Sequence, residues 1–235
     1  MVVNLAMSSK KKIVITGSEG LIGSRLKEYF GSKYDVLGLD IKLGHDLQDS
    51  SFVDKFFKEN SGIHGIIVCH AYNHIPKEGS AKIEPIDFPL EEISKFLDIN
   101  VVSVFDVCRA FIKYNDSGKI INISSLYGTL SPRHTIYNNF TKHLGYSLSK
   151  ASVVMMSKYL ATYYADNFEI NTVVLGGVYE TSFEDIFTEN YKNNVPIKRF
   201  MEIGEVPPVF DFLLDENTSY MTGTELVIDG GWTAW

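Results

Sequence analysis

The chain has 235 residues, enough to bury a full hydrophobic core, and this length allows one or two domains. Its residues are 45% hydrophobic and 22% charged, with 18 Gly and 7 Pro, which excludes a disordered, collagenous or low-complexity protein. The net charge of −7 argues against a surface that binds nucleic acid, and no stretch approaches the roughly 18 apolar residues of a membrane span.

Two features favour a cytoplasmic location. Residues 1–11 are expected to form an N-terminal tail, and its charges follow its short apolar part, so it fails the pattern of a signal peptide. Cys69 and Cys108 both lie in apolar stretches. They are therefore expected to be small buried thiols without a disulfide, which suits a reducing compartment.

Apolar, β-branched runs alternate with helix-length segments along the chain. Strands are expected over 12–16, 35–40, 65–70, 119–124, 170–175 and 225–229, and helices over about 20–31, 51–60, 90–115 and 146–166. Several strands are apolar on successive residues, which is typical of parallel strands covered on both faces. The pattern predicts one α/β domain over 12–235, with a central parallel sheet flanked by helices.

Two segments interrupt this alternation, namely 72–90, with three prolines, and 179–208, with many charges and aromatic residues. Each could be a surface loop. Because both follow strands, and loops after the carboxyl ends of parallel strands surround the ligand in such sheets, each could also form a wall of the pocket.

The first strand runs directly into a glycine-rich turn, IVITGSEGLIG over 13–23, and a helical pattern follows. Gly17, Gly20 and Gly23 allow a tight turn, a close approach of the backbone to a pyrophosphate, and close packing of the helix on the strand. An ordinary glycine turn is the alternative. The context of strand, turn and helix favours a dinucleotide-binding loop.

The second strand ends at Asp40, which follows Gly23 by 17 residues. A carboxylate at this point can accept hydrogen bonds from the adenosine ribose and repels a 2′-phosphate. Lys42 is the one nearby cation that could weaken this repulsion. NAD is therefore predicted as the cofactor in preference to NADP.

Tyr146 and Lys150 stand four residues apart in YSLSK and project from one face of a predicted helix. A lysine ammonium beside a tyrosine lowers the pKa of the phenol, so the pair could serve as a general acid and base. The same spacing occurs at Tyr29 and Lys33, which have no partner motif. The pair alone is therefore a weak signal.

The order of several motifs makes the signal specific. The matching segments are TGSEGLIG at 16–23, Asp40, Asp46-Leu47, CHAY at 69–72, Asn100 in DINV, NISSLYG at 122–128, YSLSK at 146–150, INTVVLGGV at 170–178 and MTGTELVIDGG at 221–231. With these motifs, the chain resembles the short-chain dehydrogenase/reductase family from end to end. The resemblance implies a Rossmann-type doubly wound domain, a nicotinamide dinucleotide and a homodimer or homotetramer.

The resemblance also implies catalytic roles. Ser125 would hydrogen-bond the substrate oxygen, and Tyr146 would donate or accept the proton. Lys150 would lower the pKa of Tyr146 and hold the nicotinamide ribose, and Asn100 would hold a water in a proton relay. The alternatives are a strand-end cap for Ser125, a role open to Ser124 as well, and a polar position inside a helix for Asn100.

The implied cofactor contacts cover most of these motifs. They are Gly17, Gly20, Leu21, Ile22, Gly23, Asp40, Asp46, Leu47, His70, Ala71, Tyr146, Lys150, Val178 and Thr181. At three of these positions the sequence differs from the usual family pattern. Leu21 replaces a glycine, a spacing similar to sugar-nucleotide-modifying members, and His70 replaces an asparagine that braces the sheet. Thr181 stands one residue later than the family threonine that contacts the carboxamide.

Ser125 and Tyr146 are 21 residues apart, farther than in ordinary members of the family. The inserted residues are expected to form part of the substrate wall, or else a solvated loop. Its cationic side chains could bind a carboxylate or phosphate; they are Arg133, His134, Lys142 and His143. The insertion resembles flagellin-modification dehydrogenases of a nonulosonic-sugar pathway, which implies a sugar-derived small-molecule substrate.

The leading hypothesis is an NAD-dependent oxidoreductase that moves hydride between nicotinamide and a secondary alcohol or ketone. Two other functions are alternatives to it. A sugar-nucleotide epimerase or dehydratase would recycle its cofactor without net NADH change, and a non-catalytic dinucleotide-binding protein would bind NAD without turnover. A metal site is not expected, because Cys69, His70 and His74 lack tetrahedral spacing.

The helix from Tyr146 is apolar on more than one face, and Trp232 and Trp235 follow the last strand. One face must cover the sheet, and the other face, like the two tryptophans, is too apolar for a monomer to expose. The resemblance implies a homodimer or homotetramer in which this helix and the helix at 90–115 form a two-fold contact that buries them. Alternatively, the segment 179–208 folds back over it.

Overall fold

A computed structural model describes residues 10–73, 82–138, 140–181, 183 and 185–235 of the chain. Its six parallel strands form one sheet in the order β2-β1-β3-β4-β5-β6. The strands are β1 (Lys12–Thr16), β2 (Asp35–Leu39), β3 (Ile63–Val68), β4 (Gly118–Ser125), β5 (Phe168–Leu175) and β6 (Glu225–Ile228). The predicted α/β fold is confirmed, and each strand lies within two residues of its predicted bounds.

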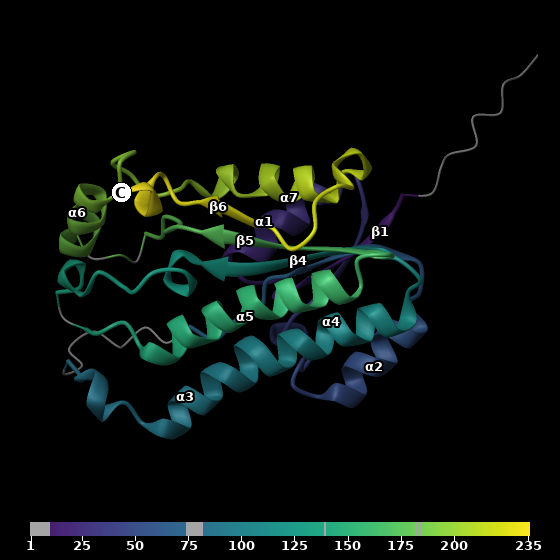
Figure 1. Cartoon of the computed structure of the whole chain (residues 1–235), viewed down its shortest axis with the longest axis horizontal. Coiled ribbons are helices and arrows are strands. Elements are labelled where there is room, and N and C mark those ends of the chain that lie inside the picture. Colours follow the sequence, from purple (N-terminus) through teal and green to yellow (C-terminus); the bar gives the residue numbers. More distant parts are fainter. Residues whose placement is uncertain (1–9, 74–81, 139, 182, 184) are drawn as a thin grey trace, which may run out of the picture.

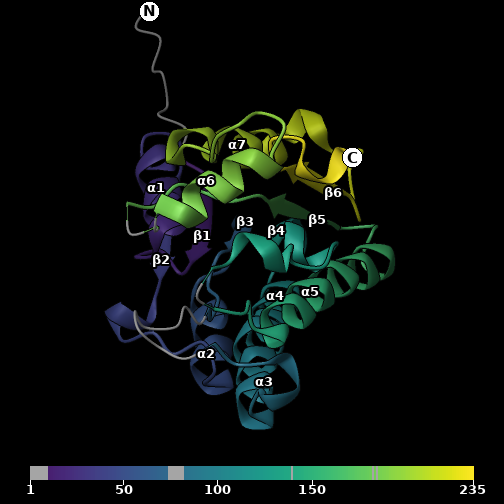
Figure 2. The ribbon, with the colours of Figure 1, turned by 90° about the vertical axis from the view of Figure 1, so that its left-hand side faces the viewer.

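Helices cover both faces of the sheet, as Figures 1 and 2 show from two sides. On one face lie α1 (Leu21–Phe30) and α7 (Pro207–Leu214). On the other lie α2 (Ser50–Glu59), α4 (Ser103–Tyr114) and α5 (Leu144–Tyr163). Each strand therefore needs apolar side chains in both directions, which explains the continuous apolar runs of the sequence.

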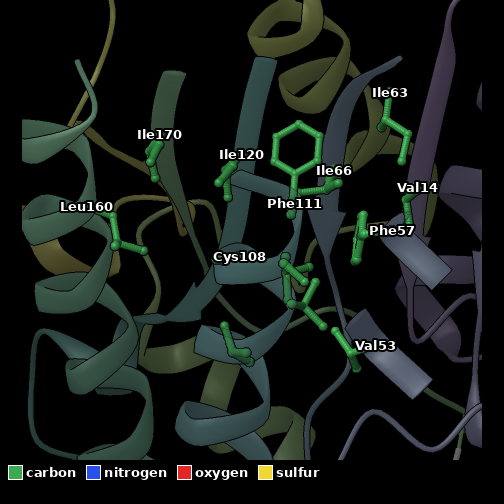
Figure 3. Packing of buried hydrophobic residues seen from close by; sticks show 14 of the residues in the cluster. Val14, Val53, Phe57, Ile63, Ile66, Cys108, Phe111, Ile120, Leu160 and Ile170 are labelled. Atoms are coloured by element: carbon green, nitrogen blue, oxygen red, sulfur yellow. The ribbon is translucent and has the colours of Figure 1, made fainter. Parts of the chain in front are cut away.

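The pleat of β1 shows how one strand serves two cores. Val14 packs with the residues of α2, α4 and α5, among them Phe111, in the cluster that Figure 3 shows. Ile13 and Ile15 point the opposite way and pack against α1 and α7. All three strand residues are fully buried. The two cores hold the sheet between the helix layers.

The long helix expected over 90–115 is divided into two. It consists of α3 (Leu90–Leu97), a π-helical turn (Asp98–Val102) and α4. The backbone N–H of Ser103 donates to the Asp98 carbonyl across this wider turn. Such π turns are frequent at functional sites, and this one carries Asn100.

Two helices were not expected. The segment 179–208, predicted as a loop or pocket wall, contains α6 (Asp185–Asn194), and α7 begins at its end. Pro207 and Pro208 start α7, where a missing N–H costs nothing because the first turn of a helix leaves its N–H groups unpaired. Helical periodicity is hidden in α6, since most of its residues are polar and only Tyr191 is buried.

The segment around α6 does fold back, but onto the C-terminal residues and not onto α5. The Tyr191 ring stacks on Phe200 at 3.9 Å and on Trp232 at 5.0 Å between ring centroids. Trp232 is 1% exposed, so the expectation that it needs a partner subunit is wrong. Trp235 remains largely exposed.

Both cysteines are free thiols, as expected. Cys108 is fully buried, and burial raises the pKa of each thiol, Cys69 and Cys108, to about 12. Within the described ranges, no helix has the length and the apolar character needed to cross a membrane.

Candidate active site

A cavity of about 540 Å³ lies at the carboxyl edge of the sheet, beside the glycine turn. The chain leaves β1 for β2 on one side and returns to β3 on the other, so this edge is a topological switch point, where ligands bind in α/β sheets. Seven predicted cofactor contacts line it: Gly17, Gly20, Asp40, Asp46, Leu47, His70 and Ala71.

The glycine turn leaves no room for side chains. Gly17 has φ +62°, and a Cβ there would lie 2.8 Å from the His70 backbone. A Cβ on Gly23 would lie 2.1 Å from the Gly17 carbonyl oxygen, so α1 packs directly on the turn. The backbone thereby forms a shallow cradle at the N-terminus of α1, which fits the pyrophosphate of a dinucleotide.

Asp40 is buried, and both of its carboxylate oxygens accept backbone hydrogen bonds. Oδ2 accepts from Glu19 N at 2.9 Å and Oδ1 from Lys42 N at 2.8 Å. The Lys42 ammonium donates to the Glu19 carbonyl at 2.9 Å. The Asp40 carboxylate is thus held beside the cavity. The Lys42 ammonium, which could weaken its repulsion of a 2′-phosphate, lies next to it.

The remaining predicted cofactor contacts lie outside the lining of this cavity. Leu21 and Thr181 are exposed, and Ile22 packs in the core under α1. Val178 pairs with Met201 in an isolated parallel bridge beyond β5. Sequence reasoning also missed part of the lining, which includes Ile41, His45, Gln48, Ile99 and Ser103.

His70 connects the first strand to α4. Ser103 donates its only hydroxyl proton to the Ile99 carbonyl, so its oxygen accepts from His70 Nε2 at 2.9 Å. His70 Nδ1 then accepts from the Thr16 hydroxyl at 2.7 Å. Burial, and the nearby charge of Lys150, lower the pKa of His70 to about 3. A neutral imidazole fits both bonds.

Asn100 holds the chain after β3. Its Oδ1 accepts from Tyr72 N at 2.6 Å, and its Nδ2 donates to the Tyr72 carbonyl at 2.9 Å. The same Nδ2 donates to Ser149 Oγ at 3.0 Å, and Ser149 donates to the Tyr146 carbonyl. Asn100 thereby links the cavity wall to the first turn of α5.

Ser125, Tyr146 and Lys150 come together where β4 ends and α5 begins. Ser125 Oγ accepts from Tyr127 N at 3.2 Å, so the serine also caps the turn after the strand. Lys150 is buried, and its ammonium donates to the Ile123 carbonyl at 3.0 Å. The ammonium lies 5.9 Å from the centroid of the Tyr146 ring.

The pKa values in this trio differ from the expected ones. Burial raises the pKa of Tyr146 above its usual value, and a side-chain hydrogen bond with Ser125 lowers it less. In this arrangement burial outweighs any lowering by Lys150, whose ammonium donates to the Ile123 carbonyl and not to the Tyr146 hydroxyl. Burial lowers the pKa of Lys150 itself to about 8.

The cations of the insertion take different roles. His143 is buried and caps α5, because its Nδ1 accepts from Gly145 N at 3.1 Å, and its ring packs on Phe88. It therefore serves the fold, and its Nε2 lies 3.8 Å from Glu92 Oε2. Arg133 donates to Asn194 Oδ1 at 2.8 Å. Lys142 lies over Tyr146, with its ammonium 4.1 Å from the ring centroid.

The second Tyr–Lys pair lies away from this site. Tyr29 closes α1 and donates to Asp211 of α7 at 3.1 Å, and Lys33 pairs with the same carboxylate. The described residues contain no group of three His, Cys, Asp or Glu that could hold a metal ion. His74, part of the weighed cluster, lies outside the described residues.

Comparisons with known proteins show the family of the chain. A family model described as enoyl-(acyl carrier protein) reductase matches residues 14–233. The chain is 27% identical over 218 residues to post-translational flagellin modification protein A of Campylobacter coli, covering 90% of this chain and 83% of that protein. It is 28% identical over 253 residues to glucose 1-dehydrogenase 2 of Bacillus subtilis (strain 168), covering 95% of each.

Among solved structures, a short-chain dehydrogenase from Leptospira borgpetersenii with bound NAD⁺ has a similar fold. Its TM-score is 0.82 at 23% identity, over 96% of this chain and 93% of that one. The chain belongs to the short-chain dehydrogenase/reductase family and is an oxidoreductase of that family.

His70 should make the fold sensitive to acid. Below pH 6.5 the unfolded chain binds a proton on this residue that the folded chain does not, because the folded pKa is about 3. The free energy of unfolding should therefore fall as the pH drops from about 6.5 toward 3, by up to about 1.4 kcal/mol per pH unit. Urea unfolding at pH 7, 6 and 5 measures this slope.

A His70→Asn variant should lose this contribution, whereas the exposed His134→Asn should keep the slope of the wild type. Identical slopes for the wild type and His70→Asn would contradict the assignment.

Proposed function

We propose that the protein is an NAD-dependent oxidoreductase that moves hydride between nicotinamide and a secondary alcohol or ketone of a sugar or sugar derivative. The observation that carries the proposal is the convergence of Ser125, Tyr146 and Lys150 beside a cavity lined by the glycine turn and Asp40. The glucose dehydrogenase and flagellin-modification relatives support a sugar-type substrate. The free cysteines support a cytoplasmic enzyme.

Each residue of the trio has a distinct role in this proposal. The dinucleotide, when bound, supplies or takes up the hydride. Ser125 hydrogen-bonds and orients the substrate oxygen, and Tyr146 exchanges a proton with it. Because burial holds the pKa of Tyr146 high, its hydroxyl is protonated at neutral pH and ready to donate. The nearby Lys150 ammonium stabilises the phenolate that remains after donation.

The backbone at the N-terminus of α1 and the Asp40 carboxylate would make the main contacts with the cofactor. The N-terminus of α1 and the turn at Gly17 and Gly20 would bind the pyrophosphate. Asp40 would bind the adenosine ribose, because its buried charge favours hydroxyl donors and repels a 2′-phosphate. Lys42 is held by the Glu19 carbonyl, which limits its use against that repulsion.

We also propose a homodimer or homotetramer assembled through α5 and α4. Met155, Tyr159 and Tyr163 on α5 are 65%, 69% and 72% exposed, and Phe105 on α4 is half-exposed. Large apolar side chains gathered on two neighbouring helices mark an interaction surface. The segment 179–208 covers Trp232 and leaves this surface open.

Tyr146→Phe should keep NAD binding and lose most of the turnover, because only the hydroxyl that transfers the proton is removed. General acid–base catalysis contributes roughly 10²–10⁴-fold, which sets the expected loss. Net NADH change with a panel of sugars, polyols and their ketones gives the rate, and calorimetry gives the affinity for NAD⁺.

Tyr29→Phe is the matched control and should leave the rate nearly unchanged, because that hydroxyl bonds Asp211 on α7. An equal loss in both variants would contradict the assignment. Substrate conversion without net NADH change would favour an epimerase, and tight NAD binding without any turnover would favour a non-catalytic protein.

Wild-type protein should bind NADH at least about tenfold more tightly than NADPH, a difference of about 1.4 kcal/mol. Asp40→Asn keeps an acceptor oxygen for the backbone and removes the charge, so it should narrow this gap without unfolding the turn. Calorimetric titration of both variants with both cofactors measures the gap. Equal dissociation constants in the wild type would rule out the preference.

Light scattering at micromolar concentration should give at least twice the chain mass of 26.5 kDa. Tyr159→Glu, which sets a charge in the middle of the exposed α5 face, should shift the protein toward the monomer. A wild-type mass of a single chain would exclude the assembly.

A further inference from the structure

Lys142 is a cation beside Tyr146 that forms an ion pair with none of the described carboxylates. Its ammonium lies over the Tyr146 ring, closer to it than that of Lys150, and donates to Asn73 Oδ1 at 2.6 Å. The side chain is half-buried. Among the residues that the structure describes, no carboxylate lies within ion-pair distance of it, although the whole chain carries a net charge of −7.

Lys142 also lines a second cavity of about 340 Å³, separate from the one beside the glycine turn. Phe88 and Leu148 contribute apolar walls, and His134 contributes a second basic side chain. None of the lining residues that the structure describes is acidic. Low-dielectric walls around an uncompensated cation strengthen its attraction for an anion.

A second, independent feature of this cavity is an unused hydroxyl. Ser147 lines the cavity, and its buried Oγ has no hydrogen-bond partner in the described part of the chain. Buried hydroxyls are nearly always bonded, so an orphaned one points to a missing partner. The cavity also adjoins Leu144, where the 20-residue helix α5 begins with its positive dipole end.

We propose that Lys142 and this second cavity form a subsite for an anionic group of the substrate, a carboxylate or a phosphate. The proposal rests on the proposed function, since the Lys142 ammonium lies over the ring whose hydroxyl would exchange the proton. The substrate is then an acidic sugar derivative whose anion lies within a few bonds of the reacting carbon. Lys142 is the residue that selects it.

The charge state of Lys142 agrees with this role. Burial and the nearby Lys150 lower the pKa of Lys142 to about 8, as expected for two cations without an anion between them. A bound anion removes this mutual repulsion, whereas a neutral sugar does not. The other basic side chains of the insertion are less suited, because His143 caps α5 and Arg133 bonds Asn194.

Binding is tested first, without relying on turnover. NADH-saturated protein is titrated calorimetrically with inorganic phosphate and, separately, with D-gluconate. The wild type should bind at least one of them, and Lys142→Met should weaken that binding tenfold or more. Arg133→Met removes a cation of the same insertion outside the cavity and should bind as the wild type does.

Absence of wild-type binding to both probes, or equal binding by Lys142→Met, would overturn the subsite. The two probes also separate a carboxylate site from a phosphate site. NADH is also titrated alone, and the probes are then added to protein without NADH. A protein that binds NADH but neither probe keeps the proposed function, whereas one that binds a probe but not NADH loses that function and keeps the anion site.

Specificity is tested next with D-glucose, D-gluconate and D-glucose 6-phosphate. The wild type should prefer an anionic compound, and Lys142→Met should raise the ratio of KM for that compound to KM for the neutral sugar at least tenfold. An equal loss on neutral and anionic compounds would show that Lys142 acts on Tyr146 and not on the substrate, and would overturn the proposal. No turnover of any of the three leaves the calorimetric result to decide.

Discussion

The site depends on the hydrogen bonds and close packing that hold α5 against β4. The buried Lys150 ammonium donates to the Ile123 carbonyl at 3.0 Å, and Ser124 Oγ donates to the Lys150 carbonyl at 2.8 Å. A Cβ on Gly128 would lie 2.8 Å from the Lys150 backbone, so the turn after β4 also packs directly on the helix. These contacts prevent α5 from sliding along the strand, and they set the distance between Ser125 and Tyr146.

A second set of hydrogen bonds connects β4 and α5 to the cavity beside the glycine turn. Asn100, on the π-helical turn, bonds the backbone of Tyr72 and the hydroxyl of Ser149, which in turn bonds the Tyr146 carbonyl. His70 joins the strand of the glycine turn to α4 in the same region. Buried hydrogen bonds, which are costly to break, therefore connect the two walls.

The sequence was sufficient to predict the sheet and most of the residues that meet at its edge. Continuous apolar runs, such as that around Val14, predict strands buried on both faces. The carboxyl ends of parallel strands share one edge, so the residues after β1, β2 and β3 had to meet there. Gly17 and Asp40 line one cavity for this reason. The motif order separated Tyr146 from Tyr29, which spacing alone could not do.

The sequence by itself thus determined the fold class and the meeting of Gly17 and Asp40 at one edge, because both follow from local periodicity and from the edge rule of parallel sheets. Only the tertiary structure decided where the charges lie. Lys142 covers Tyr146, and Lys150 bonds Ile123, because packing between distant segments chooses among side-chain directions that local sequence leaves open. Trp232 is buried by α6 for the same reason: its partner Tyr191 is distant in the sequence and adjacent only after folding.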